Sequence, residues 1–504
     1  MHPLLLIFSL ILSTSLHAAT GGGLTPDNTA GTAVTLQDQT RIIAGGTAQG
    51  GNLLHSFREF NVETGQTADF RAAADTQNIV SRVTGPNDSW VDGQIRSTTS
   101  DANLYLVNPN GIVMGENASL DVNGAFHATT ADYVTLADGQ RIYADADQGV
   151  TLTVAAPEAF GFLDASVGKI QISGSQLRVA EGQAISLVGG EIDITSSPKS
   201  DAKLEAAGGR IDLVGVASAG KVKLTSNDIT NTTATKANIS LTDSTVTADN
   251  HTDSKTVGTI QLQGADITVN NSRLQADNNS SVSAAGHSVE LDATQDIRFT
   301  GSQITAIVNS SGKGGDVTLT AAGQVSFAGA NEAGQPSGIA VLTKSTEDDA
   351  GTGGNVSIQA QDIQFAEGAD ISATTFGPGQ GGTVSLDAEN QIAFQGAVIT
   401  VDTLGTGANA GDAGDLTLQT RGDIRFTDVA QLSARTLSAG KGGDVTLTAA
   451  GQVSFAGEND DSASGIYVRT ESTEDDAGAG GSVSIQAQDI EFAEGAEISA
   501  ITFG

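Results

Sequence analysis

The feature that most constrains this chain is a set of internal repeats in its second half. The segment GGDVTLTAAGQVSFAG occupies residues 314–329 and returns unchanged at residues 442–457. Near-identical repeats therefore cover residues 314–377 and 442–504. Equivalent sequences favour equivalent surroundings, which limits the fold to a repeating architecture. A shorter module lies inside each repeat, and it opens at Gly314, Gly353, Gly381, Gly414, Gly442 and Gly480.

Each module contains three short segments in which apolar and polar residues alternate. The first reads G-x-V/L-x-L/I, the second I/V-x-F, and the third resembles residues 371–373. Alternation with period two between turn-forming residues indicates β-strands, and three strands per repeat indicate one coil of a solenoid. The pattern predicts an all-β parallel β-helix with Val, Ile, Leu and Phe inside. The alternative is a β-sandwich array, which would contain more aromatic residues and less regular repetition.

The same alternation extends upstream without close repetition. It is present at residues 169–172, 184–187 and 210–213. Residues 227–281 are rich in Thr, Asn, Asp and Ser, but alternation continues at residues 259–262. We therefore expect coils with polar loops in this region, instead of a linker.

Composition and the amino terminus indicate where the protein works. The formal net charge of −35 excludes a basic nucleic-acid-binding protein, because phosphate groups would be repelled. An apolar run at residues 4–16 is followed by Ala18 and Ala19, which predicts a signal peptide over residues 1–19. No later apolar run is long enough for a transmembrane helix. The chain has no cysteine, so disulfides do not stabilise it.

Residues 20–164 differ in kind from the repeats, because they contain several sharply defined phrases. One of them includes a tight turn at residues 108–111, where proline fixes φ and Asn and Gly tolerate left-handed conformations. This turn lies between two apolar segments, which by itself indicates a hairpin or a coil corner. The phrases are NLLHSF (52–57), FNV (60–62), NIVSRVTG (78–85), DGQI (92–95), ANLYLVNPNGI (102–112), NASLDV (117–122) and AFHATTADY (125–133).

Together these phrases resemble the secretion domain of the filamentous haemagglutinin family, the exported partners of two-partner secretion systems. The resemblance covers residues 22–135 and implies a right-handed parallel β-helix. It implies a capped secretion domain at residues 20–164, followed by repetitive coils at residues 165–504. Family members often carry a second Asn-Pro-Asn turn upstream, where this chain has residues 62–66.

The resemblance also implies a partner. It is an outer-membrane β-barrel transporter whose periplasmic domains recognise the exported chain. The implied recognition residues are Asn108, Pro109, Asn110, Gly111 and Ile112.

A search of the sequence for chemistry predicts no enzyme, no catalytic residues, no cofactor and no metal site. The H-E-x-x-H, phosphate-loop and G-x-S-x-G patterns are absent from the sequence. Residues 311–316 approach a calcium β-roll pattern but lack its first glycine and its tandem repetition, which favours a turn. The histidines after the predicted signal peptide have no metal-ligand spacing: His55, His127, His251 and His287.

The tripeptide Arg421, Gly422 and Asp423 matches a cell-binding motif that some adhesins present. It falls in a turn position of a module. Chance is the favoured explanation, because Gly and Asp are common in this chain.

These observations predict a secreted or surface-exposed exoprotein, exported through the periplasm, that acts as an adhesin or haemagglutinin-like structural rod. Its target would be a glycan or protein on a host or neighbouring cell. One alternative is a secreted polysaccharide-active β-helix enzyme, which needs clustered carboxylates with a basic partner on one face. Another is the stalk of a contact-dependent toxin whose effector lies outside this chain. The last module stops at Gly504, where the copy ending at Gly377 continues, so we expect a fragment of a longer protein or a truncated open reading frame.

Overall fold

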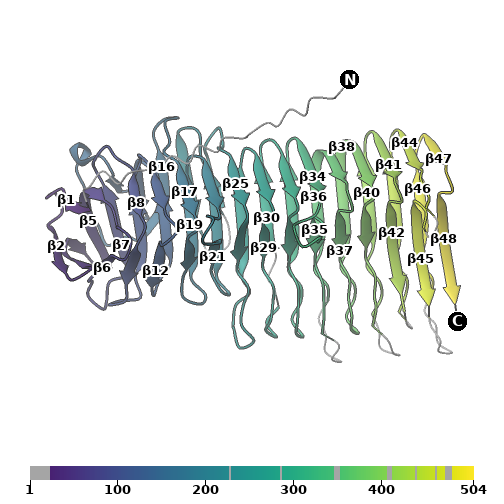
Figure 1. The fold of residues 1–504 in the computed structure, drawn as a ribbon, viewed down its shortest axis with the longest axis horizontal. Helices are drawn as coiled ribbons and strands as arrows, with labels where there is room; N and C mark the ends of the chain where they lie inside the picture. The colour runs from purple at the N-terminus through teal and green to yellow at the C-terminus, as the bar shows by residue number, and fades with distance from the viewer. Residues whose placement is uncertain are drawn as a thin grey trace, which may run out of the picture.

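The protein is a rod of stacked β-strand coils in the computed structural model (Figure 1). Successive coils follow one another along the rod from β1 and β2 to β47 and β48, which confirms the predicted parallel β-helix. The predicted signal peptide lies outside the described residues. The structure describes residues 23–225, 229–283, 287–345, 352–405, 411–437, 440–459, 462–471 and 479–503.

Each coil contributes one strand to each of three parallel faces, in the order of the three segments of each module. The first face contains β5 (Asn52–Phe60), β7 (Asn78–Val83), β10 (Asn103–Val107), β13 (Phe126–Thr129), β19 (Ala184–Gly189), β22 (Arg210–Gly215), β27 (Thr259–Gly264), β30 (His287–Ala293), β33 (Asp316–Ala321), β40 (Leu416–Thr420), β43 (Val445–Ala449) and β46 (Val483–Gln486). The second contains β8 (Ser89–Val91), β11 (Ile112–Met114), β17 (Ile170–Ser173), β20 (Ile192–Thr195), β25 (Ile239–Thr242), β28 (Ile267–Asn270), β31 (Ile297–Thr300), β34 (Gln324–Ala328), β41 (Asp423–Thr427), β44 (Gln452–Phe455) and β47 (Asp489–Phe492). Two longer strands, β36 (Val356–Phe365) and β38 (Val384–Gln395), run through both faces.

The third face forms a separate sheet. It contains β3 (Thr40–Gly45), β6 (Thr67–Phe70), β9 (Gln94–Ser97), β12 (Ser119–Val122), β18 (Gln176–Arg178), β21 (Ala202–Glu205), β26 (Ser244–Thr247), β29 (Arg273–Gln275), β32 (Gln303–Thr305), β35 (Gly338–Ala340), β37 (Asp370–Ser372), β39 (Val398–Thr400), β42 (Gln431–Thr436), β45 (Gly465–Glu471) and β48 (Glu497–Phe503). Many of its strands, such as β21 and β42, carry buried residues at alternate positions, so each of these contributes one side to the core.

Antiparallel strands cover the amino-terminal end of the helix. The strands β1 (Leu24–Pro26) and β4 (Thr47–Gln49) pair with β5, and β2 (Thr32–Gln37) pairs with β3. An uncovered first coil would expose a row of unpaired backbone groups, which is a template for uncontrolled association. The cap therefore closes the edges at which the first and third faces begin.

A smaller antiparallel sheet lies outside the coil stack. Its strands are β14 (Tyr133–Leu136), β15 (Arg141–Tyr143), β16 (Pro157–Phe162), β23 (Gly220–Leu224) and β24 (Ile229–Asn231), with a short 3₁₀ helix η1 (Ala146–Gln148) beside them. Phe160 and Val222 of this sheet join a second apolar cluster with Val80, Val107 and Val214 of the first face. The sequence analysis did not predict this sheet. The sequence does indicate that a further layer covers the first face, because apolar residues also occupy outward positions of its strands. A strand that is buried on both sides loses the alternation of apolar and polar residues.

The coil stack continues after the strands of the outer sheet, because β11 pairs directly with β17. The boundaries of the predicted domains at residues 20–164 and 165–504 stay a prediction. Among the described residues, no helix is long and apolar enough to cross a membrane.

The core of the later coils is a continuous stack of phenylalanine rings. Neighbouring rings lie nearly parallel, with centroids 4.5 to 5.7 Å apart. Each ring occupies the same position of its module, and the in-register pairing of the strands brings the rings into contact. The stack runs through Phe299, Phe327, Phe365, Phe394, Phe426, Phe455 and Phe492.

We predict that Phe394→Ala destabilises the rod by about 3–5 kcal/mol, because it leaves a cavity between two stacked rings. Phe376→Ala is the matched control, since its side chain is 38% exposed, and we expect a loss below about 1 kcal/mol. Urea unfolding of the two purified variants measures the difference. Equal losses would mean that the stack does not stabilise the coils.

Candidate transporter-recognition site

The predicted recognition residues form the corner between β10 and β11, where the chain passes from the first face to the second. Asn108 is fully buried at this corner. Its amide nitrogen Nδ2 donates to the carbonyl oxygen of Asn87 at 3.1 Å and to Oγ of Ser89 at 2.9 Å. These partners belong to the preceding coil, so the Asn108 side chain holds two successive corners together.

Asn110 completes the turn and is exposed. Its backbone N–H donates to Oδ1 of Asn108 at 3.1 Å, and its Nδ2 donates to the carbonyl oxygen of Gly85 at 2.8 Å. Gly85 ends the NIVSRVTG phrase and accepts no larger residue, because an added Cβ would lie 2.0 Å from the carbonyl oxygen of Arg58. The two phrases that carry the resemblance therefore meet at one corner.

The other residues of the predicted site also serve the turn. Pro109 is half-buried, Gly111 is buried with a φ of 136° that favours glycine, and Ile112 is fully buried in the core. Ile112 stacks between Ser89 and Ile170 of the neighbouring coils. In the folded protein, the surface of this corner that a partner can touch is formed by Pro109 and Asn110.

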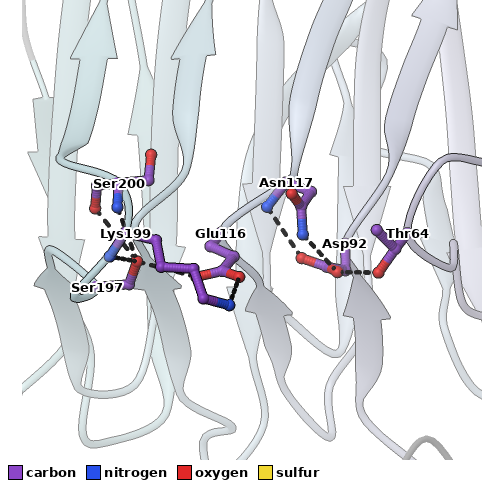
Figure 2. A network of polar contacts seen from close by, with 7 residues as sticks. All are labelled: Thr64, Asp92, Glu116, Asn117, Ser197, Lys199 and Ser200. Carbon is purple, nitrogen blue, oxygen red and sulfur yellow. Dashed lines mark hydrogen bonds and ion pairs between the residues drawn. The ribbon is translucent and has the colours of Figure 1, made fainter.

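A second corner lies between the second and third faces, and Figure 2 shows its polar contacts. Both carboxylate oxygens of the buried Asp92 accept hydrogen bonds from Asn117, one from its backbone N–H and one from its side chain, each at 3.0 Å. Oδ2 also accepts from the hydroxyl of Thr64 (Figure 2). Thr64 belongs to the segment at residues 62–66, where the family often has its other Asn-Pro-Asn turn. In this chain that segment is bonded to Asp92 of the DGQI phrase, which is bonded in turn to Asn117 of the NASLDV phrase.

The same view shows a contact between coils that are distant in sequence. Lys199 pairs with the Glu116 carboxylate at 2.9 Å, and Ser197 donates to the same carboxylate at 3.1 Å (Figure 2). Hydrogen bonds from Lys199 and Ser197 hold the pKa of Glu116 below its usual value. Since Glu116 follows β11 and Lys199 follows β20, the pair fastens a loop of a later coil to this corner.

A buried arginine network was missed by the sequence analysis. Arg82 is 2% exposed, and its guanidinium donates to Oγ of Ser56, to Oγ1 of Thr29 and to the carbonyl oxygen of Tyr143, at 2.8, 2.9 and 2.6 Å. One side chain thus joins a coil, the amino-terminal cap and the outer sheet. The carboxylate of Asp27 accepts from Ser56 at 2.6 Å. Burial raises the pKa of Asp27, but hydrogen bonds from Ser56, Thr29 and Thr84 outweigh it and lower that pKa. The sequence signal for this network was Arg82, the one charged residue in the phrase NIVSRV.

The tripeptide at residues 421–423 lies at the entry to β41. Arg421 is exposed, and Gly422 and Asp423 are half-buried. Oδ1 of Asp423 accepts the backbone N–H of Gln452 in the next coil at 2.8 Å, and Oδ2 accepts from Arg425 at 2.5 Å. Oδ1 of Asp423 therefore takes part in coil stacking, and Oδ2 is paired within its own strand. Arg421 presents the exposed surface of the motif.

The two histidines of the family-like phrases lie far from solvent. Burial lowers the pKa of His55 to about 4 and that of His127 to about 4, and the charge of Arg210 contributes to the second shift. Both rings are therefore neutral at pH 7. Across the described ranges, no group of three or more His, Asp or Glu side chains could hold a metal ion.

These features define a class, a capped parallel β-helix whose first coils are joined at polar corners. Comparison with known families then shows that residues 22–255 match the TPS secretion domain. The match supports a two-partner-secretion exoprotein, exported across the outer membrane through a transporter. The matched domain is described as a secretion domain, and the match gives no evidence of catalytic activity. The finer assignment to filamentous haemagglutinins stays a prediction.

The other comparisons add little to this. No curated protein matches the chain. Among solved structures, the chain is similar to the crystal structure of the HMW1 secretion domain from Haemophilus influenzae, with 15% sequence identity and a TM-score of 0.47. That alignment covers 93% of this chain and 100% of the other.

We predict that Asn108→Ala destabilises the corner by about 1–3 kcal/mol, because it leaves buried groups without hydrogen-bond partners. Asn110→Ala removes two hydrogen bonds of an exposed amide, to Gly85 and to Asn108, and should cost about 0.5–1.5 kcal/mol. Hydrogen–deuterium exchange of the purified chains measures the local effect, with faster exchange expected at residues 103–114 in the Asn108 variant. Unchanged exchange in that variant would contradict a structural role for Asn108.

Proposed function

We propose that the transporter recognises the exported chain at the corner formed by Pro109 and Asn110. This proposal rests on the different burial of the residues at this corner. Asn108, Gly111 and Ile112 are buried, whereas Asn110 is exposed. The buried residues shape the turn, and the exposed amide and proline ring offer the contact surface. Recognition at an open strand edge is less favoured, because the cap already pairs with the first strands of the first and third faces.

We also propose that the exported protein acts as an adhesin or an extended structural rod on the outside of the cell. The length and regularity of the coil stack support this function, since a rod displays its outer loops away from the surface that carries it (Figure 1). Local stacking supports it as well, because each coil can fold on the preceding one after it leaves the transporter. The target is a glycan or a protein on a host or neighbouring cell.

Two alternatives remain as proposals of lower rank. A toxin stalk would share this rod but would carry an effector domain outside the chain. A polysaccharide-active enzyme would need clustered carboxylates beside a base. In the regions that the structure describes, the carboxylates at the coil corners accept hydrogen bonds from backbone groups of the next coil, as Asp316, Asp423 and Asp444 do. That arrangement supports stacking over catalysis.

The export proposal is tested by expressing Asn110→Ala together with the cognate transporter. We expect the ratio of extracellular to periplasmic protein to fall about tenfold, because the exposed contact is lost while the hydrogen bonds of Asn108 to Asn87 and Ser89 remain. Asn123→Ala is the matched control. It removes an amide that bonds to Thr98 and Asp101 in another corner of the same domain. Secretion of the Asn110 variant at the wild-type level would remove the proposed role.

The adhesion proposal is tested with purified secreted protein added to cells that have been treated with either periodate or protease. Loss of binding after periodate indicates a glycan target, and loss after protease indicates a protein target. Arg421→Ala tests the tripeptide, and we expect less than a twofold change, because its aspartate is occupied by the next coil. Absence of binding to untreated cells would contradict the adhesin function.

A further inference from the structure

The third face carries two neighbouring arginines in the carboxyl-terminal coils. Arg435 of β42 and Arg469 of β45 are direct partners in the parallel pairing of these strands, which lie side by side in Figure 1. Both occupy outward positions, because the residues on either side of each arginine are buried. Like charges that face each other on neighbouring strands destabilise a sheet. This pair therefore weakens the stack, and the proposed export function does not use it.

Among the described residues, a carboxylate neutralises one of the two arginines. Oδ2 of Asp402 in the preceding coil lies 3.8 Å from Nε of Arg435, and Oδ1 of Asp402 accepts from the hydroxyl of Ser433 at 2.7 Å. The Arg469 guanidinium lies over the ring of Tyr467, 5.1 Å from its centroid, and forms no ion pair with a described carboxylate. A carboxylate from a partner would therefore neutralise Arg469.

The ring of Tyr467 holds Arg469 in place. The Tyr467 hydroxyl donates to the carbonyl oxygen of Ala463 at 3.1 Å, which fixes the ring on which the guanidinium lies. Burial and the neighbouring Glu497 carboxylate raise the pKa of Tyr467, so the phenol is neutral at pH 7. An arginine that already lies on an aromatic ring loses less side-chain freedom when it binds a partner.

A partner can reach the Nη end of each guanidinium. The Nε atoms of Arg435 and Arg469 are buried without a hydrogen-bond partner, so they are out of reach. The Nη atoms are not among the buried atoms and have no hydrogen-bond partner in the described structure, and the Arg435 side chain is 37% exposed. Since the two strands lie about 4.8 Å apart, both Nη ends can converge on one carboxylate.

The two long repeats differ at this surface. Residues 338–343 (GIAVLT) correspond to residues 465–470 (GIYVRT). The buried Ile, Val and Thr are the same in both, whereas Tyr467 and Arg469 replace the outward Ala340 and Leu342. On the first and second faces, residues 316–328 recur unchanged at residues 444–456. The second repeat therefore carries an aromatic ring and a cation on the third face that its coil packing does not require.

Apolar side chains lie beside the arginines. Leu437 follows Arg435 by two residues, Leu404 follows Asp402 by two residues, and both leucines are half-buried. Tyrosine and arginine are enriched at the centres of protein–protein interfaces. A partner with both acidic and apolar side chains fits this surface better than a polysaccharide, whose hydroxyl groups would meet the two leucines without hydrogen-bond partners.

We propose that the third face around Arg435, Tyr467 and Arg469 binds an acidic segment of a partner protein. A carboxylate of the segment pairs with the Nη ends of the two arginines, and an apolar side chain of the same segment lies against Leu437. The rest of the chain is strongly negative, so it repels an acidic segment and leaves this surface as the place of binding. This inference deepens the adhesin proposal and rests on it for the place where the partner is met.

The test is fluorescence anisotropy on the purified full chain with three labelled probes. They are a peptide of alternating glutamate and leucine, the same peptide with glutamine in place of glutamate, and heparin as a sulfated polysaccharide. We expect the glutamate peptide to bind with an affinity that falls as salt is raised, because the contact is ionic. The glutamine peptide should bind about tenfold more weakly or less.

Arg469→Leu removes one cation and introduces the residue that the first repeat has at this position. Leu342 shows that the module accepts leucine there, and circular dichroism checks that the variant is folded. We expect its affinity for the glutamate peptide to fall about tenfold. Arg421→Leu is the matched control, since it makes the same substitution at an exposed arginine away from the third face, and it should bind as the wild type does.

Three results would overturn the proposal. They are no binding of the glutamate peptide to the wild type, equal binding of the glutamine peptide, and unchanged affinity of a folded Arg469→Leu variant. Binding of heparin without binding of the glutamate peptide would replace the protein partner by a sulfated polysaccharide.

The same protein added to untreated cells separates this inference from the adhesin proposal. A chain that binds cells but not the glutamate peptide would contradict the inference and leave the adhesin function in place. A chain that binds the peptide but no cells would contradict the adhesin function and leave the binding surface in place.

Discussion

The whole molecule depends on the in-register pairing of equivalent residues in successive coils. Parallel strands bond through their backbones at a spacing of about 4.8 Å, so any side chain that repeats at the same position meets its own copy in the next coil. The phenylalanine stack follows from this spacing, with ring centroids 4.5 to 5.7 Å apart. The polar corners follow from it too, because a carboxylate such as Asp423 finds the backbone N–H of the next coil at hydrogen-bond distance. A narrow core with few aromatic residues is therefore sufficient to stabilise the rod, because each repeated core residue packs against its own copy in the next coil.

In-register parallel pairing leaves an unpaired strand edge where the coil stack begins, and in this protein antiparallel pairing covers that edge. Antiparallel strands cover the first coil, and the Arg82 guanidinium bonds the cap, the coil and the outer sheet at once. The outer sheet in turn covers part of the first face, where Phe160 and Val222 pack against Val107 and Val214. The amino-terminal part is therefore more than the first turns of a rod. It has an added antiparallel layer over its first face and antiparallel strands over its first coil.

Much of the fold was predictable from the sequence. The three alternating segments of each module gave the three faces, and the regular I/V-x-F pattern placed phenylalanine at one core position. The turn at residues 108–111 was predicted as a hairpin or a coil corner, because proline and glycine set its backbone locally, and the structure shows a coil corner. The outer sheet could not be placed in this way. Its strands pair antiparallel with each other across long loops, and no periodic pattern connects Tyr133 with Gly161 or Phe160 with Val222.

By itself, the sequence determined the repeating β-helix and the phrases that mark a secretion domain, because both depend on local pattern and short-range turns. Only the tertiary structure decided which residues of the phrase ANLYLVNPNGI face solvent. Asn108 and Asn110 look alike in the sequence, yet one is buried against the preceding coil and the other is exposed. Likewise, His127, Ser186 and Asp212 lie in separate phrases, and strand pairing brings them onto one ladder. The physical reason is that burial and neighbourhood depend on which coils stack, and that is a property of the folded chain.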